Sequence, residues 1–577
     1  MKAALNGIGR HAQSGVVAAL LVVLFLQAVL SMRLLNASFD EPFHLVSGYA
    51  YWRTGEIRLN PEHPPLIKLI AALPLYLLQP GVNLADPAWT QGRPGAERFA
   101  IPALYTDDAD RLLFWGRLPV VLLAVLLGLY VYRWARDLFG AGAGLLALFL
   151  YVVCPNVIAH SRFVTMDLGL SCFFLIALYY LWRFCHDGGG RNLVAAGLGL
   201  GLALATKFSA VLLVPTMALL LGLAAVWSPT AGQESRAKRG SAKARPKGTL
   251  DTLVTIGDRG PRLQLAVMAY LFLLVMASAV VYAVYLFPRN LDFYWQGMKE
   301  VQANHDPSYP DYLFGQFKKG GWWYYFLAAF LIKTPVPTLI LLVLSIVLMK
   351  RYPARHRLDE AFLVAPAIIF FGFTSALANN LGVRYILPVY PLLFIFVSRL
   401  ASFFSRSRVR LALASVLGAW LIVAAIRIYP DHLAYFNEVV GGPGNGWKYL
   451  DDSNIDWGTD LKRLKRYMEQ HGIERLKLAI SSTASADHPD TQALQNLNYD
   501  RVSRDEWARQ PLPGIYAVST NALIRGELYA KALGWRSNWL TRYRPIGRVG
   551  YGFYLFKFDA APGGNPTWPS GAGRSTD

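Results

Sequence analysis

The sequence predicts a polytopic α-helical membrane protein with about eleven transmembrane helices and a soluble α/β domain at its C-terminal end. Three observations lead to this fold class. Of its 577 residues, 54% are hydrophobic and only 16% are charged, and the mean hydropathy is positive. Apolar runs long enough to cross a bilayer recur along the chain. From about residue 428 the composition becomes that of a soluble domain.

The apolar runs define the expected membrane spans, because about 17 to 25 residues of helix cross the hydrocarbon core. They lie near 15–35, 112–132, 142–160, 166–184, 192–206, 209–227, 263–287, 324–349, 360–378, 384–400 and 409–427. The first run follows Arg10, but no small-x-small cleavage site follows it, so we expect it to be retained as a span.

Charge between the spans predicts the orientation, since short cytoplasmic loops carry an excess of Lys and Arg. With the N-terminus inside, every inner loop is basic, including 133–136, 183–191 and 350–357. The outer loop 36–111 holds nine acidic and six basic residues, and the chain from 428 onward holds 16 acidic and 18 basic. The net charge of +20 therefore reflects topology, and nucleic-acid binding is not expected.

These boundaries divide the chain into a membrane domain (1–430), an extracytoplasmic α/β domain (431–562) and a disordered tail (563–577). The Lys-, Arg- and Ser-rich stretch 228–262 is expected to be a flexible cytoplasmic linker. In the C-terminal domain, Asp460 to Gln470 has a helical pattern, and strands are expected at 476–481, 514–518 and 551–558. The three cysteines lie in or beside apolar spans without metal-type spacing, so we interpret them as packing residues.

Asp40 and Glu41 follow the first span, where water meets the bilayer. Adjacent residues on a helix point about 100° apart, so one carboxylate can face a reaction while the other orients a neighbour. The alternative is local: Asp40 is a suitable N-cap, and Glu41-Pro42 suits the first turn of a helix. Both interpretations stay open on this pattern.

Further ionisable residues fall at the outer ends of the expected spans. They are His63 in a His-Pro-Pro turn, Arg162 and Asp167 at the junction of the third and fourth spans, Lys207 between the fifth and sixth, and Arg384 at the start of the tenth, followed by Tyr385. Each has an ordinary interpretation: an exposed turn residue, an Arg162–Asp167 salt bridge, or cations that reach the interface. However, cations are disfavoured on the outer face. A group of them there predicts an anionic ligand such as a phosphate headgroup.

Two polar loops of the C-terminal region are less specific. Gly441 to Gly446 lacks the strand and the Lys-Ser/Thr ending of nucleotide-binding loops, and we interpret it as a connection into the C-terminal domain. The run from Asp451 to Gly458 could bind a divalent ion or a sugar, but its spacing does not match an EF-hand, and a polar loop that caps the next helix is the alternative.

The order of several motifs resembles glycosyltransferase family 39, the protein O-mannosyltransferase group, whose bacterial relatives include the lipid A aminoarabinose transferases. The motifs are Phe39-Asp40-Glu41, His63-Pro64-Pro65-Leu66 with Lys68, Arg162 to Asp167, Gly201 to Phe208, Asn380 to Tyr385 and Asp456-Trp457-Gly458. The resemblance covers about residues 15–430 in order and the C-terminal domain more loosely. Where the aminoarabinose transferases have a basic residue before Pro-Pro, this chain has His63.

The resemblance implies a GT-C fold and a sugar donor carried on a polyprenyl phosphate. The charge bias of the loops places these residues on the extracytoplasmic side, and the likeness to bacterial members indicates a bacterial plasma membrane. The family's catalytic loop carboxylate maps onto Asp40, with Glu41 beside it. The donor phosphate is then expected to meet Arg384, Lys207, His63 and Arg162, with Asp167 and Tyr385 in support. The acceptor is expected to be a lipid, glycan or protein hydroxyl.

Such a transferase needs no cofactor if cations neutralise the phosphate, although Asp40 and Asp167 could share a divalent metal. Two other classes stay open. A transporter or flippase for a lipid-linked or anionic solute would carry ionisable groups near the middle of the membrane and often repeated halves. A membrane scaffold would use the C-terminal domain to bind a partner. The concentration of charges at the outer surface favours the transferase.

Overall fold

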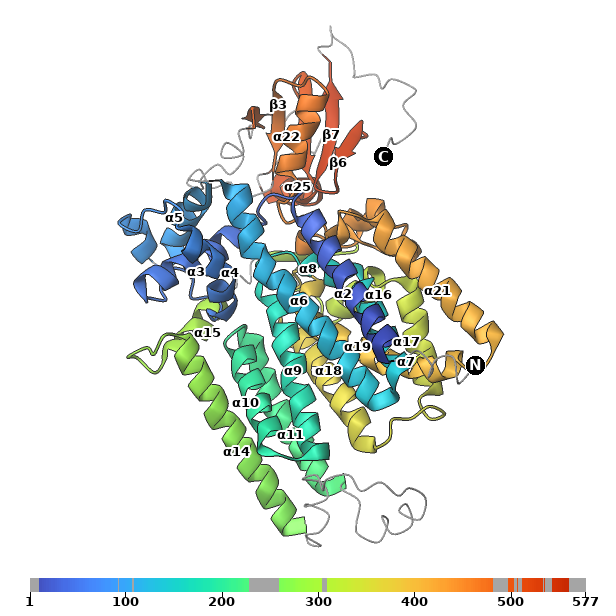
Figure 1. The fold of residues 1–577 in the computed structure, drawn as a ribbon. Helices are drawn as coiled ribbons and strands as arrows, with labels where there is room; N and C mark the ends of the chain where they lie inside the picture. Colours follow the sequence, from blue (N-terminus) through green and yellow to red (C-terminus); the bar gives the residue numbers. More distant parts are fainter. Residues whose placement is uncertain are drawn as a thin grey trace.

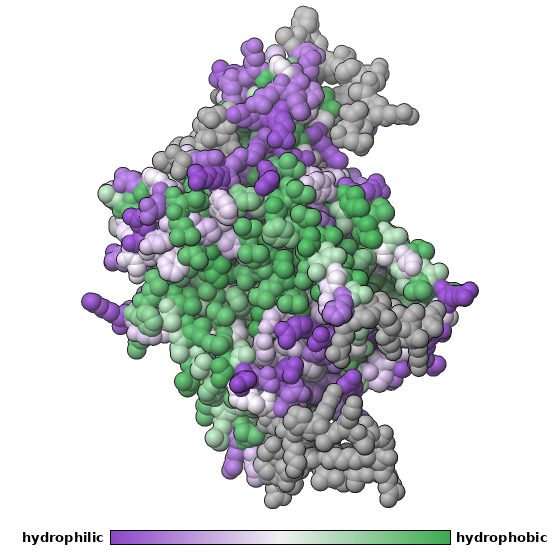
Figure 2. Space-filling view, in the orientation of Figure 1, coloured by the Kyte–Doolittle hydropathy of each residue, from purple (hydrophilic) through white to green (hydrophobic). Residues whose placement is uncertain are grey.

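The computed structural model describes residues 10–91, 93–105, 108–227, 259–303, 309–480, 497–502, 506, 511–532, 534 and 542–559. It consists of a large bundle of helices with a small sheet domain at one end (Figure 1). The middle of the bundle presents a broad apolar surface, and hydrophilic residues lie at both ends (Figure 2). This banded surface is what a multi-pass membrane protein requires, and it confirms the predicted fold class. Most of the linker 228–262, and the tail 563–577, lie outside the described residues.

Within the described residues, seven helical segments are long and apolar enough to cross a membrane. They are α2 (Arg10–Met32), α6 (Ala109–Phe139), α9 (Met166–Asp187), η2 (Phe208–Leu212) continuing into α11 (Leu213–Trp227), α14 (Arg259–Val284), α18 (Arg357–Leu377) and α21 (Arg408–Arg427). Each corresponds to one of the eleven predicted spans.

The other four predicted spans are broken or short. Helices α16 (Tyr325–Lys333) and α17 (Val336–Leu348) are bent by 112°. Pro335 lies at the junction and Pro337 in the first turn of α17, and proline interrupts helical hydrogen bonding. The helix α7 (Ala141–Val152) gives way to α8 (Pro155–His160) at a proline. The remaining two are α10 (Gly190–Leu204) and α19 (Val389–Val397), which η5 (Ser398–Leu400) and α20 (Ala401–Phe404) extend.

The outer loop 36–111 forms its own helices beside the bundle: α3 (Glu41–Thr54), α4 (Leu66–Leu78), η1 (Pro87–Thr90) and α5 (Arg93–Tyr105) (Figure 1). Helices α3 and α4 pack closely at Gly48. A Cβ atom at this position would lie 2.1 Å from the Lys68 carbonyl oxygen, so only glycine allows the approach. This packing fixes the direction in which α3 starts.

The second outer loop contains α15 (Phe293–Ala303) and an antiparallel hairpin of β1 (Pro310–Leu313) and β2 (Gln316–Lys319). Beyond α21, a series of 3₁₀ turns crosses the end of the bundle. These are η6 (His432–Ala434), η7 (Glu438–Val440), η8 (Pro443–Lys448) and η9 (Asp452–Asn454). An earlier turn, η4 (Val383–Ile386), precedes α19. At the α16–α17 bend, the buried Lys333 ammonium donates to the carbonyls of Leu433 (2.6 Å) and Asn454 (2.5 Å). The bend thereby anchors the start of the C-terminal region.

In the described part of the C-terminal domain, five strands form a mixed sheet in the order β4-β3-β5-β7-β6. Its elements are α22 (Leu461–Gln470), β3 (Leu476–Ala479), β4 (Tyr499–Arg501), β5 (Gly514–Ser519), α25 (Thr520–Ala532), β6 (Gly547–Val549) and β7 (Phe553–Phe558). Strand β3 is parallel to β4 and β5, whereas β7 is antiparallel to β5 and β6. The predicted helix and the three predicted strands are confirmed.

Candidate active site

The loop between α2 and α3 is held in place by the C-terminal region. Its backbone N–H groups at Asn36 and Phe39 donate to the carbonyls of Thr459 (3.2 Å) and Trp457 (3.0 Å). The Asn36 side chain also donates to the Gly458 carbonyl at 2.6 Å. The position of Asp40, directly after this loop, is therefore set by residues more than 400 positions away in the sequence.

Asp40 occupies the N-cap position of α3, but its side chain makes no capping hydrogen bond. Instead, Arg384 Nη1 donates to Asp40 Oδ2 at 3.2 Å. The Asp40 side chain keeps 26% of its surface exposed. The sequence left capping and catalysis open, and the structure shows a carboxylate that is turned away from its own helix end and toward a cation.

Arg384 belongs to a cluster of charges contributed by four separate elements. Its Nη1 lies 3.8 Å from Asp167 Oδ2, in the first turn of α9, while Lys207 Nζ contacts Asp167 Oδ1 at 2.5 Å. Lys207 directly precedes η2, and Arg384 lies in η4. The structure thus brings together four of the predicted residues, in an alternating arrangement of two carboxylates and two cations.

Two aromatic rings enclose the cations. Tyr385 lies 4.4 Å from Lys207 Nζ, measured to the ring centroid, and 5.3 Å from the Arg384 guanidinium carbon. Trp457, from the C-terminal region, lies 4.3 Å from the same guanidinium carbon. Cations over aromatic faces are stabilised by the ring quadrupole without using their hydrogen-bond donors. The Arg384 Nε atom is buried and has no hydrogen-bond partner among the described residues, so the guanidinium retains capacity for a ligand.

Two histidines line the same region. His63 lies next to His44, with 5.8 Å between ring centroids, and the Nδ1 atoms of both are buried without a hydrogen bond within the described part of the chain. Burial lowers the pKa of both rings well below the usual value, and the neighbouring Lys and Arg charges lower it further. His63 was expected to act as a cation toward phosphate. A neutral His63 ring has one hydrogen-bond donor and one acceptor, and it would contact a phosphate through a hydrogen bond instead of a charge.

His44 was not singled out from the sequence. The signal was present, because His44 follows Asp40 by four residues and so lies on the same face of a helix. A histidine in that position is ordinarily a core or surface residue. Only the approach of His63 from the next loop makes His44 part of the site.

Glu41 has a different place from the one expected for a catalytic residue. Its side chain is completely buried and receives two hydrogen bonds from Arg117, from Nε at 2.8 Å and Nη2 at 2.6 Å. The backbone N–H groups of Ser38 (2.8 Å) and Val164 (3.0 Å) donate to the same carboxylate. With both oxygens engaged and no exposed surface, Glu41 is a positioning residue for the loop that carries Asp40.

Arg162 is also outside the cluster. Its side chain is buried, and among the described residues it forms no salt bridge with Asp167, which pairs with Lys207 and Arg384. The carboxylates that act on it electrostatically are Asp431 and Asp460, from the C-terminal region. Its Nε and Nη1 atoms are buried without a hydrogen-bond partner among the described residues, so the expected role of Arg162 as a phosphate ligand stays a prediction.

The two carboxylates that could share a metal ion are instead bridged by Arg384. In the part of the chain that the structure describes, no group of three or more His, Cys, Asp or Glu side chains is arranged to hold a metal ion. A divalent metal shared by Asp40 and Asp167 stays a prediction.

The chain was compared with known proteins. Residues 109–239 match the family model described as dolichyl-phosphate-mannose-protein mannosyltransferase. The match includes Asp167 and Lys207 and confirms, for this segment, the resemblance indicated by the motifs. No curated protein matches the chain.

Several solved structures match the chain at low identity. One is ArnT from Cupriavidus metallidurans bound to undecaprenyl phosphate, at 15% identity, with 94% of this chain and 96% of that chain covered and a TM-score of 0.47. Another is the Archaeoglobus fulgidus oligosaccharyltransferase in complex with Zn and sulfate, at 12% identity, covering 94% and 73%, with a TM-score of 0.42. A third is the S. cerevisiae protein O-mannosyltransferase Pmt1-Pmt2 complex bound to the sugar donor, at 16% identity, covering 52% and 39%, with a TM-score of 0.32.

Proposed function

We propose that this protein is an inverting glycosyltransferase that moves a sugar from a polyprenyl-phosphate donor to an acceptor hydroxyl at the extracytoplasmic face of a bacterial plasma membrane. The observation that carries the proposal is the Asp40 side chain. It makes no capping hydrogen bond to its own helix and pairs with Arg384, in one cluster with Lys207. A partly exposed carboxylate beside two cations has the parts of a general base next to an anion-binding site.

The cations account for the donor phosphate. As the bond between the anomeric carbon and the phosphate oxygen breaks, negative charge builds on the leaving polyprenyl phosphate. Arg384 and Lys207 are held in advance by Asp167 and by the Tyr385 ring. Preorganised cations stabilise this charge most in the transition state, and the stabilisation therefore accelerates the reaction.

Asp40 accounts for the acceptor. Burial raises the pKa of its carboxyl group, while the Arg384 charge lowers it. The deprotonated carboxylate takes the proton from the acceptor hydroxyl, the hydroxyl oxygen bonds to the anomeric carbon, and polyprenyl phosphate leaves with the bonding electron pair. A single displacement from the opposite face inverts the anomeric configuration. General-base assistance of this kind is typically worth about 10² to 10⁴-fold in rate.

The position of the cluster supports an extracytoplasmic reaction. The loop of Asp40 is hydrogen-bonded to residues 457–459, at the end of the bundle where the sheet domain lies (Figure 1). The basic loops that the charge bias assigns to the cytoplasm connect the other ends of the helices. No nucleotide sugar is available outside the plasma membrane, so a donor activated on a membrane lipid fits this side.

The test is sugar transfer by the purified full-length protein with the variant Asp40→Asn. Mass spectrometry of lipid A, envelope polysaccharide and secreted proteins from a deletion strain first identifies the missing sugar and its acceptor. We expect Asp40→Asn to lose at least about 10²-fold in rate. Asp292→Asn, an exposed aspartate in the second outer loop, is the matched control and should transfer normally.

Normal transfer by Asp40→Asn would refute the assignment of Asp40. Intact glycans together with a defect in solute uptake in the deletion strain would favour a transporter. Addition of EDTA tests the metal: cations in the cluster replace it in the proposed mechanism, so we expect activity to persist.

A further inference from the structure

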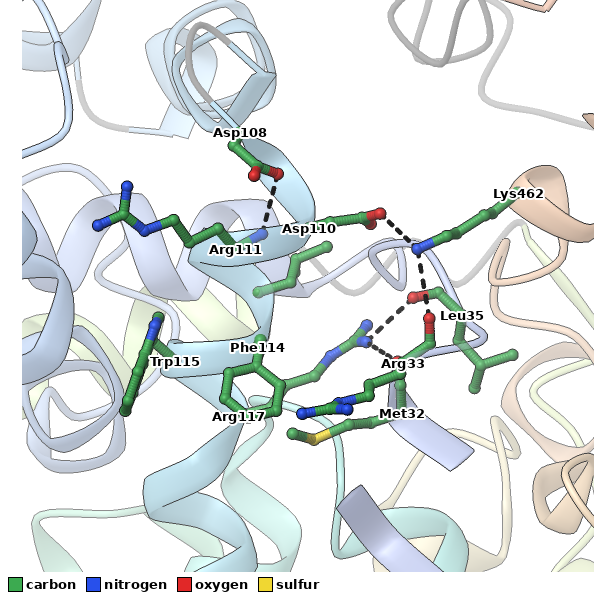
Figure 3. Close-up of a pocket in the computed structure, with 11 residues that line it drawn as sticks. Met32, Arg33, Leu35, Asp108, Asp110, Arg111, Phe114, Trp115, Arg117 and Lys462 are labelled. Carbon is green, nitrogen blue, oxygen red and sulfur yellow. Dashed lines mark hydrogen bonds and ion pairs between the residues drawn. The ribbon is translucent and has the colours of Figure 1, made fainter. Parts of the chain in front are cut away.

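A second site lies beside the proposed active site. A pocket of about 290 Å³ opens between the C-terminal end of α2, the first two turns of α6 and Lys462 of α22 (Figure 3). Its lining does not include Asp40, Lys207 or Arg384. The pocket is therefore separate from the cluster to which the donor phosphate is assigned.

The pocket has an excess of positive charge. Four cationic side chains and two carboxylates line it. Lys462 forms an ion pair with Asp110, and Arg117 is committed to Glu41. The remaining two cations are Arg33 and Arg111, whose guanidinium groups form no ion pair within the described residues. Asp108, the other carboxylate, accepts a hydrogen bond from the backbone N–H of Arg111 at the start of α6 (3.1 Å).

Aromatic side chains place the pocket at the boundary between lipid and water. The Arg33 guanidinium carbon lies 4.9 Å from the centroid of Phe114, and Phe114 packs edge-on against Trp115 at 5.4 Å. Trp115 leaves 40% of its surface exposed. In Figure 3 the Arg111 and Trp115 side chains lie on one side of the pocket and Lys462 on the opposite side. An exposed tryptophan just below charged residues is typical of a membrane interface.

We propose that this pocket binds the phosphate headgroup of an anionic membrane lipid, in addition to the donor lipid. The volume fits a headgroup, not a whole lipid, and the apolar surface of α6 that begins at Phe114 and Trp115 would receive the acyl chains. Arginine is well suited to phosphate because its donors match two phosphate oxygens at once. Arg33 and Arg111 interrupt the charge bias of the outer face, which is explained if they meet an anionic headgroup.

The pocket is connected to the catalytic loop through Arg117. This side chain lines the pocket and also donates to the carbonyls of Met32 (2.9 Å), Leu35 (3.1 Å) and Asn36 (2.7 Å). A headgroup seated here would contact the backbone segment that leads to Asp40. The proposal does not depend on the transferase assignment, because it concerns lipid binding alone.

The experiment is native mass spectrometry of the delipidated full-length protein in detergent, titrated with phosphatidylglycerol. The test variant is Arg33→Ala/Arg111→Ala. The charge-matched control is Lys319→Ala/Arg466→Ala. It removes two exposed cations that do not line the pocket, one in the second outer loop and one in α22. We expect the test variant to lose its tightest-bound lipid, with affinity at least about tenfold lower, and the control to bind like the wild type. Arg33→Lys/Arg111→Lys should recover part of the affinity.

Two outcomes would overturn the proposal. Equal phosphatidylglycerol binding by the test variant, the control and the wild type would show that the pocket is not a lipid site. If inorganic phosphate competes as strongly as phosphatidylglycerol, the ligand is a soluble phosphate. A thermal melt of each variant establishes that it is folded, so that loss of binding can be assigned to the pocket. Zwitterionic phosphatidylcholine should bind the test variant and the wild type equally.

Discussion

The variant Glu41→Gln should be much less stable toward unfolding than the wild-type protein. In the native protein the Glu41 carboxylate accepts two hydrogen bonds from Arg117 and two from backbone N–H groups. Neither side chain of the pair exposes more than 1% of its surface. Glutamine has one acceptor oxygen in place of two, so it cannot satisfy all four donors.

Most of the loss in unfolding free energy comes from the Arg117 charge, which loses its counter-ion. Arg117 would stay buried and cationic without its counter-ion, and breaking a buried ion pair from one side typically costs about 3 to 5 kcal/mol. Total unfolding free energies are about 5 to 15 kcal/mol, so the loss is a large share. The double variant Glu41→Gln/Arg117→Met removes the lone charge. It should recover only part of the stability, because the carbonyls of Met32, Leu35 and Asn36 then lose their donor.

The assay is unfolding of the purified protein in detergent by increasing dodecyl sulfate, followed by tryptophan fluorescence. Glu56→Gln is the matched control, since the Glu56–Arg58 pair is exposed (43% and 55%) and such pairs contribute at most about 1 kcal/mol. If Glu41→Gln unfolds within about 1 kcal/mol of the wild type, the assignment of Glu41 to positioning is wrong.

Three further predictions concern the site and the C-terminal region. Lys207→Met should weaken binding of the polyprenyl-phosphate donor at least about tenfold, because a charge-assisted contact to phosphate is lost; unchanged donor affinity in equilibrium binding would exclude Lys207 from the phosphate site. The transfer rate should fall in acid through a midpoint above 3.8, because burial raises the pKa of Asp40 above that reference value and the base must be deprotonated; a pH–rate profile without an acid limb above that value would contradict this. Burial also raises the pKa of Asp456 to about 7, with Asp460 adding to the effect. The folded state then favours protonated Asp456, so the free energy of unfolding should fall as pH rises from about 4 to about 7, by at most about 1.4 kcal/mol per pH unit. Asp456→Asn should reduce this slope without abolishing it, because burial also raises the pKa values of Asp451 and Asp460, and an unchanged slope would refute the assignment to Asp456.

The positions of the membrane helices were largely predictable. All eleven apolar runs appear as helices, since long apolar segments have few other options in a membrane. What could not be predicted is whether each apolar run forms one continuous helix across the membrane or a broken or shorter one. The α16–α17 segment contains enough apolar residues for one span, but it is bent by 112° where its prolines lie. Hydropathy reports composition, and it does not report the direction of a helix after a break.

The candidate site was predictable as a set of charges, but its internal assignments required the fold. Asp40, Asp167, Lys207 and Arg384 were selected because ions at membrane boundaries are costly without a purpose. Which carboxylate is partly exposed and which is completely buried depends on Arg117, a residue within an apolar span that no motif marked. Trp457 likewise covers Arg384 only because the C-terminal region returns to the first loop. Such long-range pairings leave no local pattern.

The hydrogen bonds between the first loop and residues 457–459 bear on how the protein is made. During synthesis the segment around Asn36 leaves the ribosome long before its partner Gly458, 422 residues later. Until that partner arrives, Asn36 and Phe39 have no acceptors there, and Trp457 cannot cover Arg384. A chain that is only partly inserted into the membrane therefore carries every charged residue of the cluster without the assembled site. The cluster that we assign to catalysis therefore cannot assemble completely until the last domain has been made.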